Sequence, residues 1–263
     1  MVVTSQYVTI EIDEQQIGWL TFRNPSRRHA LSTALLQEME AALTELARRA
    51  VPVVVLTSGI GEKVWSAGHD ISELVDERDP LASGKPLERI IRQVRAYPGV
   101  VIAMVSGSVW GGAVDLAMGS DLIIADETAS FNMTPANIGL AYSTSGLLRF
   151  FNNLPIHRLK EMFFCATPLT AVQALQFGVV NRLVVGDELR AATSEVAHNI
   201  TTKAPLAVQA VKEQLRILED LQPMPVDAME RIAALRHAAC EGADMKEGLD
   251  AFLQRRPAHF SGS

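Results

Sequence analysis

The stretch Val100–Asp121, VVIAMVSGSVWGGAVDLAMGSD, decides the fold of this chain. Its apolar run predicts a buried strand, Gly111-Gly112 predicts a turn, and Ala113–Met118 predicts a short helix. A strand that enters a helix through glycines leaves the first helical N–H groups without intrahelical acceptors and lets a ligand approach the backbone. We interpret the N–H of Gly112 as one half of an oxyanion hole. Close packing of the helix on a sheet is the alternative that this stretch leaves open.

A second junction, Ala67–Asp70, also places small residues just after an apolar segment. Ligands of α/β sheets bind at such strand ends. If both junctions face one pocket, the N–H groups of His69 and Gly112 bind a single oxygen, and each donor contributes about 2.7–4 kcal/mol to stabilising an enolate or a tetrahedral oxyanion. We assign His69 this backbone role, with its ring lining the pocket, in preference to general-base catalysis.

The composition is that of a globular protein. The chain has 263 residues, of which 48% are hydrophobic and 21% charged, enough for one large or two modest domains. A formal net charge of −6 argues against a nucleic-acid or membrane-surface partner. Cys165 and Cys240 show no CxxC spacing and are expected to be reduced thiols of a cytoplasmic protein. We expect neither a signal peptide nor a membrane span.

Strands and helices alternate up to about residue 190, and the chain is helical beyond it. Val51–Thr57 is a continuous apolar run, which is typical of a strand in a sheet covered on both faces. Further strands are predicted at 7–13, 17–22, 122–125, 130–133 and 179–185, and helices at 33–49, 87–96, 147–152 and 172–178. The sequence therefore predicts an α/β core over 1–190 and a helical region over 191–263.

Several kinds of chemistry lack their sequence signatures. The chain has no G-x-S-x-G elbow and no signature of a cysteine nucleophile, and its six histidines show no metal-ligand spacing, so we expect no metal site. Asp115 lies three residues after Gly112, and its side chain either projects towards the pocket or pairs at the helix surface. Arg28 and Arg255 either bind phosphate groups or are solvated surface charges.

Taken together, the motifs resemble those of the crotonase (enoyl-CoA hydratase/isomerase) superfamily over nearly the whole chain. The matching segments are Asn24-Pro25, His29–Ser32, Trp65–Ile71, Gly107, Trp110–Ala113, Ser120–Leu122, Phe131, Ile138-Gly139, Lys203–Pro205 and Glu247–Phe252. The resemblance implies a ββα spiral core over 1–190 that binds an acyl-CoA and a helical trimerisation region over 191–263. It also implies a homotrimer or a dimer of trimers, which is a hexamer.

The resemblance implies which residues bind the substrate. The carbonyl oxygen of an acyl-CoA thioester is expected between the N–H groups of His69 and Gly112. Substrate or CoA contacts are implied for Arg28, Ala30, Ala67, Ile71, Trp110, Asp115 and Arg255, with Arg256 as the alternative to Arg255.

The chain departs from the pattern of the hydratases in this superfamily, which add water with two glutamates. Asp115 stands at the first of these positions, where it is shorter by one methylene. Pro135, which cannot ionise, stands at the second. Ordinary hydration is therefore disfavoured.

Other segments resemble the superfamily members that decarboxylate methylmalonyl-CoA. They are SAGHDI at 66–71, GSVWGGA at 107–113, SDLIIA at 120–125 and the pattern MTP-x-N-x-G-x-x-Y at 133–142. This resemblance implies decarboxylation of methylmalonyl-CoA, or of a related malonyl thioester, to propionyl-CoA through a thioester enolate. Tyr142 and Thr134 would hold the departing carboxylate perpendicular to the thioester plane. Tyr142 or a water would then protonate the enolate carbon.

The reaction so implied uses no metal, biotin or nicotinamide cofactor, and CoA is part of the substrate. The acyl-CoA thioester is the expected partner, with no nucleic acid and no membrane. Two alternatives are enoyl-CoA hydration through Asp115 and double-bond isomerisation. A third is a crotonase homologue that binds acyl-CoA without catalysis.

Overall fold

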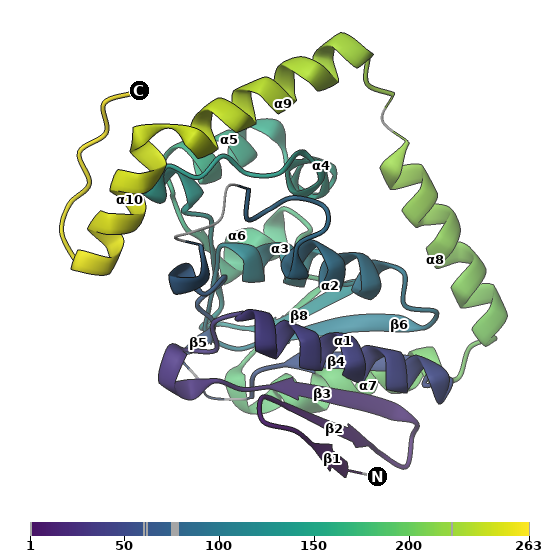
Figure 1. Cartoon of the computed structure of the whole chain (residues 1–263). Coiled ribbons are helices and arrows are strands. Elements are labelled where there is room, and N and C mark those ends of the chain that lie inside the picture. The colour runs from purple at the N-terminus through teal and green to yellow at the C-terminus, as the bar shows by residue number, and fades with distance from the viewer. Residues whose placement is uncertain (1, 60, 62, 75–78, 222, 263) are drawn as a thin grey trace.

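The computed structural model describes residues 2–59, 61, 63–74, 79–221 and 223–262, which form two β-sheets flanked by helices (Figure 1). The seven-stranded sheet has the strand order β1-β2-β3-β4-β6-β8-β11, and the four-stranded sheet has the order β10-β9-β7-β5. The strands are β1 (Val2–Thr4), β2 (Val8–Ile12), β3 (Ile17–Phe22), β4 (Val53–Thr57), β5 (Val64–Ser66), β6 (Val100–Val105), β7 (Ser108–Trp110), β8 (Leu122–Asp126), β9 (Ser130–Asn132), β10 (Leu169–Thr170) and β11 (Arg182–Val184).

Successive strands alternate between the two sheets before the chain enters a helix. β4 belongs to the large sheet and β5 to the small one, and α2 (Pro86–Arg95) follows them. In the same way β6 and β7 precede α3 (Gly112–Met118), and β8 and β9 precede α4 (Thr144–Asn153). The strands β3, β4, β6, β8 and β11 run parallel, as helical crossovers require. This repeated ββα unit confirms the predicted α/β class and core.

The remaining helices lie before and after these repeats. They are α1 (Thr33–Arg48), α5 (Ile156–Phe164), α6 (Ala171–Gln176), α7 (Leu189–Thr201), α8 (Pro205–Asp220), α9 (Val226–Glu241) and α10 (Ala243–Gln254), with short 3-10 helices at Pro25–Arg27, Ile71–Glu73, Pro135–Ile138 and Gly186–Glu188. α1 begins where the Ser32 hydroxyl accepts a hydrogen bond from Leu35 N, and such a cap contributes about 1 kcal/mol.

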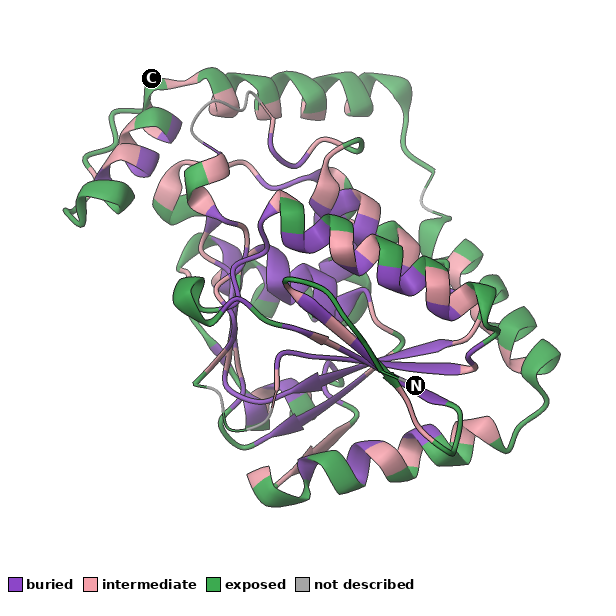
Figure 2. Cartoon of the chain, turned by 60° about the horizontal axis from the view of Figure 1, so that its bottom comes forward, coloured by how far each residue is buried: buried purple, intermediate pink, exposed green. Residues whose placement is uncertain are grey.

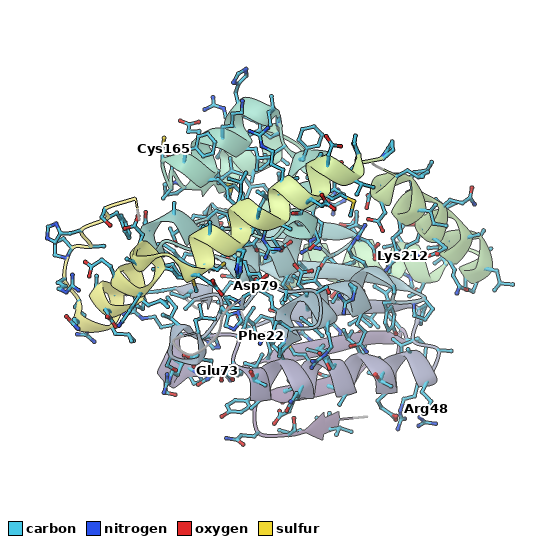
Figure 3. All side chains as sticks on the ribbon, turned by 45° about the horizontal axis from the view of Figure 1, so that its top comes forward. Phe22, Arg48, Glu73, Asp79, Cys165 and Lys212 are labelled. Atoms are coloured by element: carbon cyan, nitrogen blue, oxygen red, sulfur yellow. The ribbon has the colours of Figure 1, made fainter. Side chains whose placement is uncertain are left out.

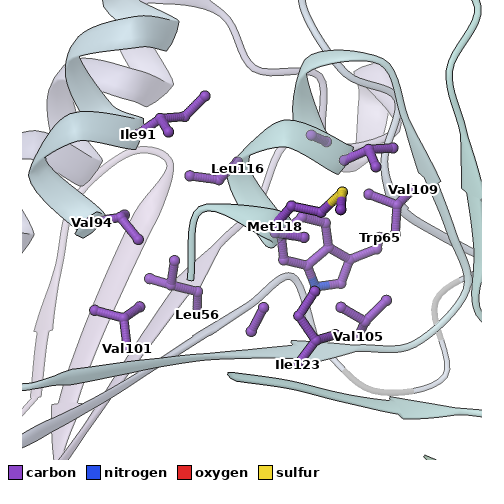
Figure 4. Packing of buried hydrophobic residues seen from close by; sticks show 14 of the residues in the cluster. Leu56, Trp65, Ile91, Val94, Val101, Val105, Val109, Leu116, Met118 and Ile123 are labelled. Atoms are coloured by element: carbon purple, nitrogen blue, oxygen red, sulfur yellow. The ribbon is translucent and has the colours of Figure 1, made fainter. Parts of the chain in front are cut away.

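The central strands of the large sheet are buried on both faces, as the apolar run at Val51–Thr57 predicts (Figure 2). On β4, Val54 and Leu56 join a cluster that includes residues of α1, α2 and α3, whereas Val53 and Val55 join a second cluster that α7 completes. Alternate strand residues point to opposite faces, so both sides of the sheet are covered. Figure 4 shows Leu56 in the first cluster, in which residues of α2 and α3 pack against the sheet.

α8 and α9 lie along the outside of the molecule and contribute no buried residue (Figures 1 and 2). Val208 of α8 packs against the second cluster, and a cavity of about 620 Å³ lies between α8 and the rest of the protein. Lys212 of α8, labelled in Figure 3, bridges this gap with its ammonium group 2.7 Å from Asp121 Oδ2 and 2.9 Å from the carbonyl oxygen of Gly99. Among the described helices, none combines the length and hydrophobicity needed to cross a bilayer.

Candidate active site

Three strands of the small sheet run parallel and end at the same edge. β5 pairs with β7, and β7 pairs with β9, which places Trp110 opposite Asn132. The residues that follow the strands therefore meet in space: Ala67–His69 after β5, Gly111-Gly112 after β7 and Thr134 shortly after β9. The two junctions predicted from the sequence do converge, and a third strand end adds Thr134 to them.

Gly68 shows how closely the first two junctions approach each other. A Cβ atom built on Gly68 would lie 2.4 Å from the carbonyl oxygen of Trp110 and 3.4 Å from the nitrogen of Gly112. Gly68 also has a φ of +82°, which residues with a side chain rarely adopt. The Ser66 hydroxyl holds this turn, since it donates to the carbonyl oxygen of His29 at 2.6 Å and accepts from Gly68 N at 3.2 Å. Glycine at position 68 thus lets the end of β5 lie against the start of α3.

The segment before α1 runs beside this turn. The carbonyl oxygen of Arg28 accepts from Ala67 N at 2.9 Å, and Leu31 N donates to the carbonyl oxygen of Gly68 at 2.7 Å. Ala30 is buried between these contacts, whereas the Arg28 side chain is exposed at the rim of the site.

A cavity of about 530 Å³ opens where the strand ends meet. Cavities of this size hold cofactor-sized ligands. The sequence-predicted residues that line it are Arg28, Ala67, His69, Ile71, Trp110, Gly112, Thr134 and Tyr142. Ala30, Asp115 and Arg255 lie outside its wall. Apolar wall residues that the sequence analysis did not single out are Leu74, Leu81, Leu87, Leu140 and Phe252.

The charged groups of the cavity wall are basic. Arg28 and Arg256 line it together with the ionisable side chains of His69 and Tyr142, and the described wall contains no carboxylate. Such a surface suits an anionic ligand. In the described ranges, no three His, Cys, Asp or Glu side chains are arranged to hold a metal ion.

Tyr142 lines the cavity, but its hydroxyl donates a hydrogen bond to a residue outside the cavity wall. Its hydroxyl donates to Asp115 Oδ2 at 2.9 Å, and Phe163 packs edge-on against its ring at a centroid distance of 5.4 Å. Burial, followed by the charge of Asp115, raises the pKa of Tyr142 well above its ordinary value. The phenol is therefore neutral near pH 7.

Asp115 occupies neither of the two places considered from the sequence. Every residue of α3 is buried, so Asp115 has no exposed helix surface at which to pair. Its side chain instead forms a bidentate ion pair with Arg149 of α4, with Nε 2.6 Å from Oδ1 and Nη2 2.7 Å from Oδ2. The carboxylate lies behind Tyr142 and is not part of the cavity wall.

Glu88 of α2 completes this buried network, and the sequence analysis missed both Glu88 and Arg149. Glu88 Oε1 accepts from Arg149 Nη2 at 3.1 Å and from the Ser143 hydroxyl at 2.8 Å. One signal was present in the sequence, because Glu88 lies on the apolar face of α2 among Leu87, Ile90, Ile91 and Val94. A charge in an apolar stripe requires a buried partner.

The end of α10 and the residues after it close another side of the cavity. Arg256 lines the wall and pairs with Glu247, with Nη1 2.5 Å from Oε1 and Nη2 2.7 Å from Oε2. This pairing, together with the N–H of His259, lowers the pKa of Glu247 to about 2. Arg255 is exposed at the end of α10 with a φ of +55°. Of the two arginines, Arg256 is the one at the cavity.

A further segment reaches the cavity from beneath α9. Pro80 and Leu81 line the wall, and the adjacent Asp79 is held by Arg236 of α9 through two contacts of 2.9 Å (Figure 3). Residues 75–78 lie outside the described part of the chain.

The chain is similar over nearly its whole length to known proteins of one family. The enoyl-CoA hydratase/isomerase family model matches residues 13–263. The chain is 40% identical over 258 residues to the methylmalonyl-CoA decarboxylase of Escherichia coli (strain K12), which covers 98% of both chains. A crystal structure of methylmalonyl-CoA decarboxylase matches with a TM-score of 0.94 and 39% identity over 99% of this chain and 100% of that one. A crystal structure of methylmalonyl-CoA decarboxylase complexed with 2S-carboxypropyl-CoA matches over the same shares, with 39% identity and a TM-score of 0.96.

Proposed function

We propose that this chain, which belongs to the enoyl-CoA hydratase/isomerase family, decarboxylates methylmalonyl-CoA to propionyl-CoA. The family resemblance inferred from the motifs is confirmed, because the family model and the 40%-identical decarboxylase both match nearly the whole chain. The activity is that of a carbon–carbon lyase acting on a CoA thioester.

One observation carries this choice of reaction within the family. The described cavity wall holds basic and neutral groups without a carboxylate, and Arg149 and Tyr142 occupy both oxygens of the nearby Asp115. Asp115 is only 1% exposed, so it is not placed to activate a water for hydration. Loss of CO2 needs no such base.

The chemistry then depends on stabilising negative charge on the thioester oxygen. The bond between the α-carbon and the carboxylate breaks, CO2 leaves, and the electron pair becomes the enolate. The proposed donors to the enolate oxygen are the N–H groups of His69 and Gly112. Gly112 is the first residue of α3, so its N–H has no acceptor within the helix. Each donor of this kind is worth about 2.7–4 kcal/mol in the transition state.

Thr134 and Tyr142 are the proposed holders of the departing carboxylate. Both line the cavity, and a fixed perpendicular carboxylate aligns the breaking bond with the carbonyl. A proton then adds to the enolate carbon. Tyr142 or a water is the proposed proton source. The reaction consumes one proton and requires no cofactor beyond the CoA that the substrate carries.

The CoA portion is proposed to lie along the basic side of the cavity. Arg28 and Arg256 would pair with its phosphates, and Ala67, Ile71 and Trp110 would contact the rest of it. Ala30 would act through the buried backbone beside Arg28. Arg255 would contact CoA only where the molecule extends past the cavity rim.

α8 and α9 provide the proposed oligomer contacts. Their exposed apolar side chains include Leu206, Val211, Leu215, Leu218, Val226, Met229 and Leu235. An apolar surface of this extent is typical of an interface, and a homotrimer or a dimer of trimers would cover it. Cys165 and Cys240 are both free thiols, which supports a cytoplasmic location.

Incubation of the pure protein with methylmalonyl-CoA and, separately, with crotonyl-CoA tests the proposal. The expected result is the formation of propionyl-CoA and CO2. Liquid chromatography with mass spectrometry detects the propionyl-CoA. Hydration of crotonyl-CoA without decarboxylation would instead support a hydratase. Tight binding of both thioesters without turnover would support a non-catalytic acyl-CoA-binding protein.

A further inference from the structure

A buried charge network lies behind Tyr142 and joins three helices. Asp115 of α3, Arg149 of α4 and Glu88 of α2 are 1%, 7% and 2% exposed. The Arg149 guanidinium contacts both oxygens of Asp115 and also Oε1 of Glu88. None of these three groups lines the 530 Å³ cavity, although Arg149 also lines the cavity beside α8. Tyr142 touches both the network and the 530 Å³ cavity.

The hydrogen bonds of Tyr142 present a conflict. A phenol has one proton, and here it is donated to Asp115 Oδ2 at 2.9 Å. A substrate carboxylate has only acceptor oxygens, so it would meet the lone pairs of the Tyr142 oxygen. Tyr142 can hold that carboxylate only if its O–H stops donating to Asp115 and donates to the substrate instead.

We propose that Arg149 is a positioning residue that keeps Asp115 satisfied, so that Tyr142 can transfer its hydrogen bond from Asp115 to the carboxylate of the substrate. This inference rests on the proposed decarboxylation. It assigns to Arg149 a role that acts through Asp115 and Tyr142 and not through contact with the substrate.

The geometry provides what the transfer needs. When Tyr142 turns away, Asp115 retains the Arg149 Nε contact on Oδ1 and the Nη2 contact on Oδ2. Without Arg149, Tyr142 would be the only donor to Asp115 among the hydrogen bonds described here, and its departure would strand a buried carboxylate. The phenol would then stay on Asp115.

Glu88 keeps the guanidinium in place and charged. It is itself held by the hydroxyls of Ser143 and Ser145, at 2.8 and 3.1 Å. Burial alone would lower the pKa of Arg149, but the hydrogen bonds and charges of Asp115 and Glu88 outweigh it and raise that pKa. In the network, two carboxylates therefore share one permanent cation. A neutral side chain in place of Arg149 removes the counter-charge of both and so tests what that cation does.

The experiment compares Arg149→Met, Asp115→Asn and the double variant with the wild type. We expect Arg149→Met to lower kcat/KM for methylmalonyl-CoA by about 10- to 100-fold, the value of a hydrogen bond to a charged group. The dissociation constant of propionyl-CoA, which lacks the carboxylate, should change less than about threefold, the scatter expected between uncoupled sites. Arg48→Met, which removes an exposed pair with Glu45, is the matched control.

The double variant separates positioning from folding. In the Asp115→Asn background there is no charge at position 115 to satisfy, and Glu88 keeps its donors Ser143 and Ser145, so Arg149→Met should change kcat/KM less than about threefold. If Arg149→Met alone fails to fold, a large loss caused by Arg149→Met in the Asp115→Asn background still overturns the proposal. An equally large loss with Asp115 and with Asn at that position, or equal loss of methylmalonyl-CoA and propionyl-CoA binding, overturns the proposal.

A wild-type protein that forms no propionyl-CoA would refute the proposed function separately. Arg149 is then judged on binding, since its removal should still weaken methylmalonyl-CoA more than propionyl-CoA. Equal weakening of both would refute the role of Arg149 as well.

Discussion

Gly68 and Gly112 lie against each other although they follow different strands: a Cβ on Gly68 would be 3.4 Å from the Gly112 nitrogen. The pairing of β5 with β7 brings the two strand ends together, and the missing side chain of Gly68 allows them to touch. The spacing between the two proposed oxyanion donors, His69 N–H and Gly112 N–H, is therefore set by Gly68, which is not itself one of the two donors.

Replacement of Gly68 by alanine should lower kcat for methylmalonyl-CoA by at least about 100-fold, as loss of an oxyanion donor does. The new methyl group would lie 2.4 Å from the carbonyl oxygen of Trp110, so the two junctions must separate. Steady-state kinetics on a variant shown to be folded by circular dichroism makes the measurement. Gly84→Ala is the matched control, because its Cβ would meet no atom within 4 Å. Wild-type turnover by folded Gly68→Ala would show that this spacing is unimportant.

Replacement of Tyr142 by phenylalanine should slow decarboxylation by about 10- to 100-fold while leaving propionyl-CoA binding nearly unchanged. The variant loses the group proposed to hold the carboxylate, whereas Asp115 keeps both contacts with Arg149. Rapid-quench assays and calorimetric titration measure the two effects. Tyr97→Phe, whose hydroxyl donates to the Val51 carbonyl oxygen at 2.8 Å, serves as the control. Unchanged turnover in Tyr142→Phe would remove Tyr142 from the mechanism.

Tyr97 should make the protein less stable at alkaline pH. Burial raises the pKa of Tyr97, so the folded protein retains a proton that the unfolded chain releases above about pH 10. The resulting stability is complete below that pH and is lost as the pH rises further. Above pH 10, the free energy of unfolding of the wild type should therefore fall with pH by about 1.4 kcal/mol per pH unit more than that of Tyr97→Phe. Urea unfolding from pH 9 to 11.5 measures it, and parallel slopes for the two proteins would contradict the assignment.

Replacement of Glu247 by glutamine should loosen the chain around Arg256 and His259, whereas Asp244 still holds Ser261 and Gly262 on α10. Glu247 pairs with Arg256 and accepts from the N–H of His259 at 2.9 Å. Because its pKa is lowered to about 2, this hold is present above the ordinary glutamate range and is lost as the pH falls towards 2. The variant should show faster amide exchange in a peptide spanning 255–262 at pH 7, as measured by mass spectrometry. Asp250→Asn on the same helix is the control, and equal exchange in the two variants would argue against this hold.

Local patterns in the sequence predicted most of the large sheet and the helices around it. The apolar run at Val51–Thr57, the helix predicted at 33–49 and the Gly111-Gly112 turn each depend on neighbouring residues, and the structure contains the corresponding elements. The sequence indicated strand ends before Ala67 and before Gly111 but did not give the bounds of the short strands β5 and β7. Three residues are too few to show a period, and these strands exist because they pair with each other and with β9.

The candidate site divides in the same way. The sequence pointed to His69, Gly112, Thr134 and Tyr142, all of which line one cavity. The resemblance implied substrate contacts for Asp115 and for Arg255 or Arg256, and the structure locates Arg256 in the cavity wall and both Asp115 and Arg255 outside it. The sequence analysis missed Glu88 and Arg149, because the role of each depends on a partner that lies on another helix.

By itself, then, the sequence determined the strand-to-helix turns, since backbone freedom at a glycine and burial of an apolar run are properties of adjacent residues. Only the tertiary structure decided what each charged side chain does. Asp115 became an internal partner of Arg149 because α3 and α4 pack together, and a buried charge is stable only where folding supplies its counter-charge.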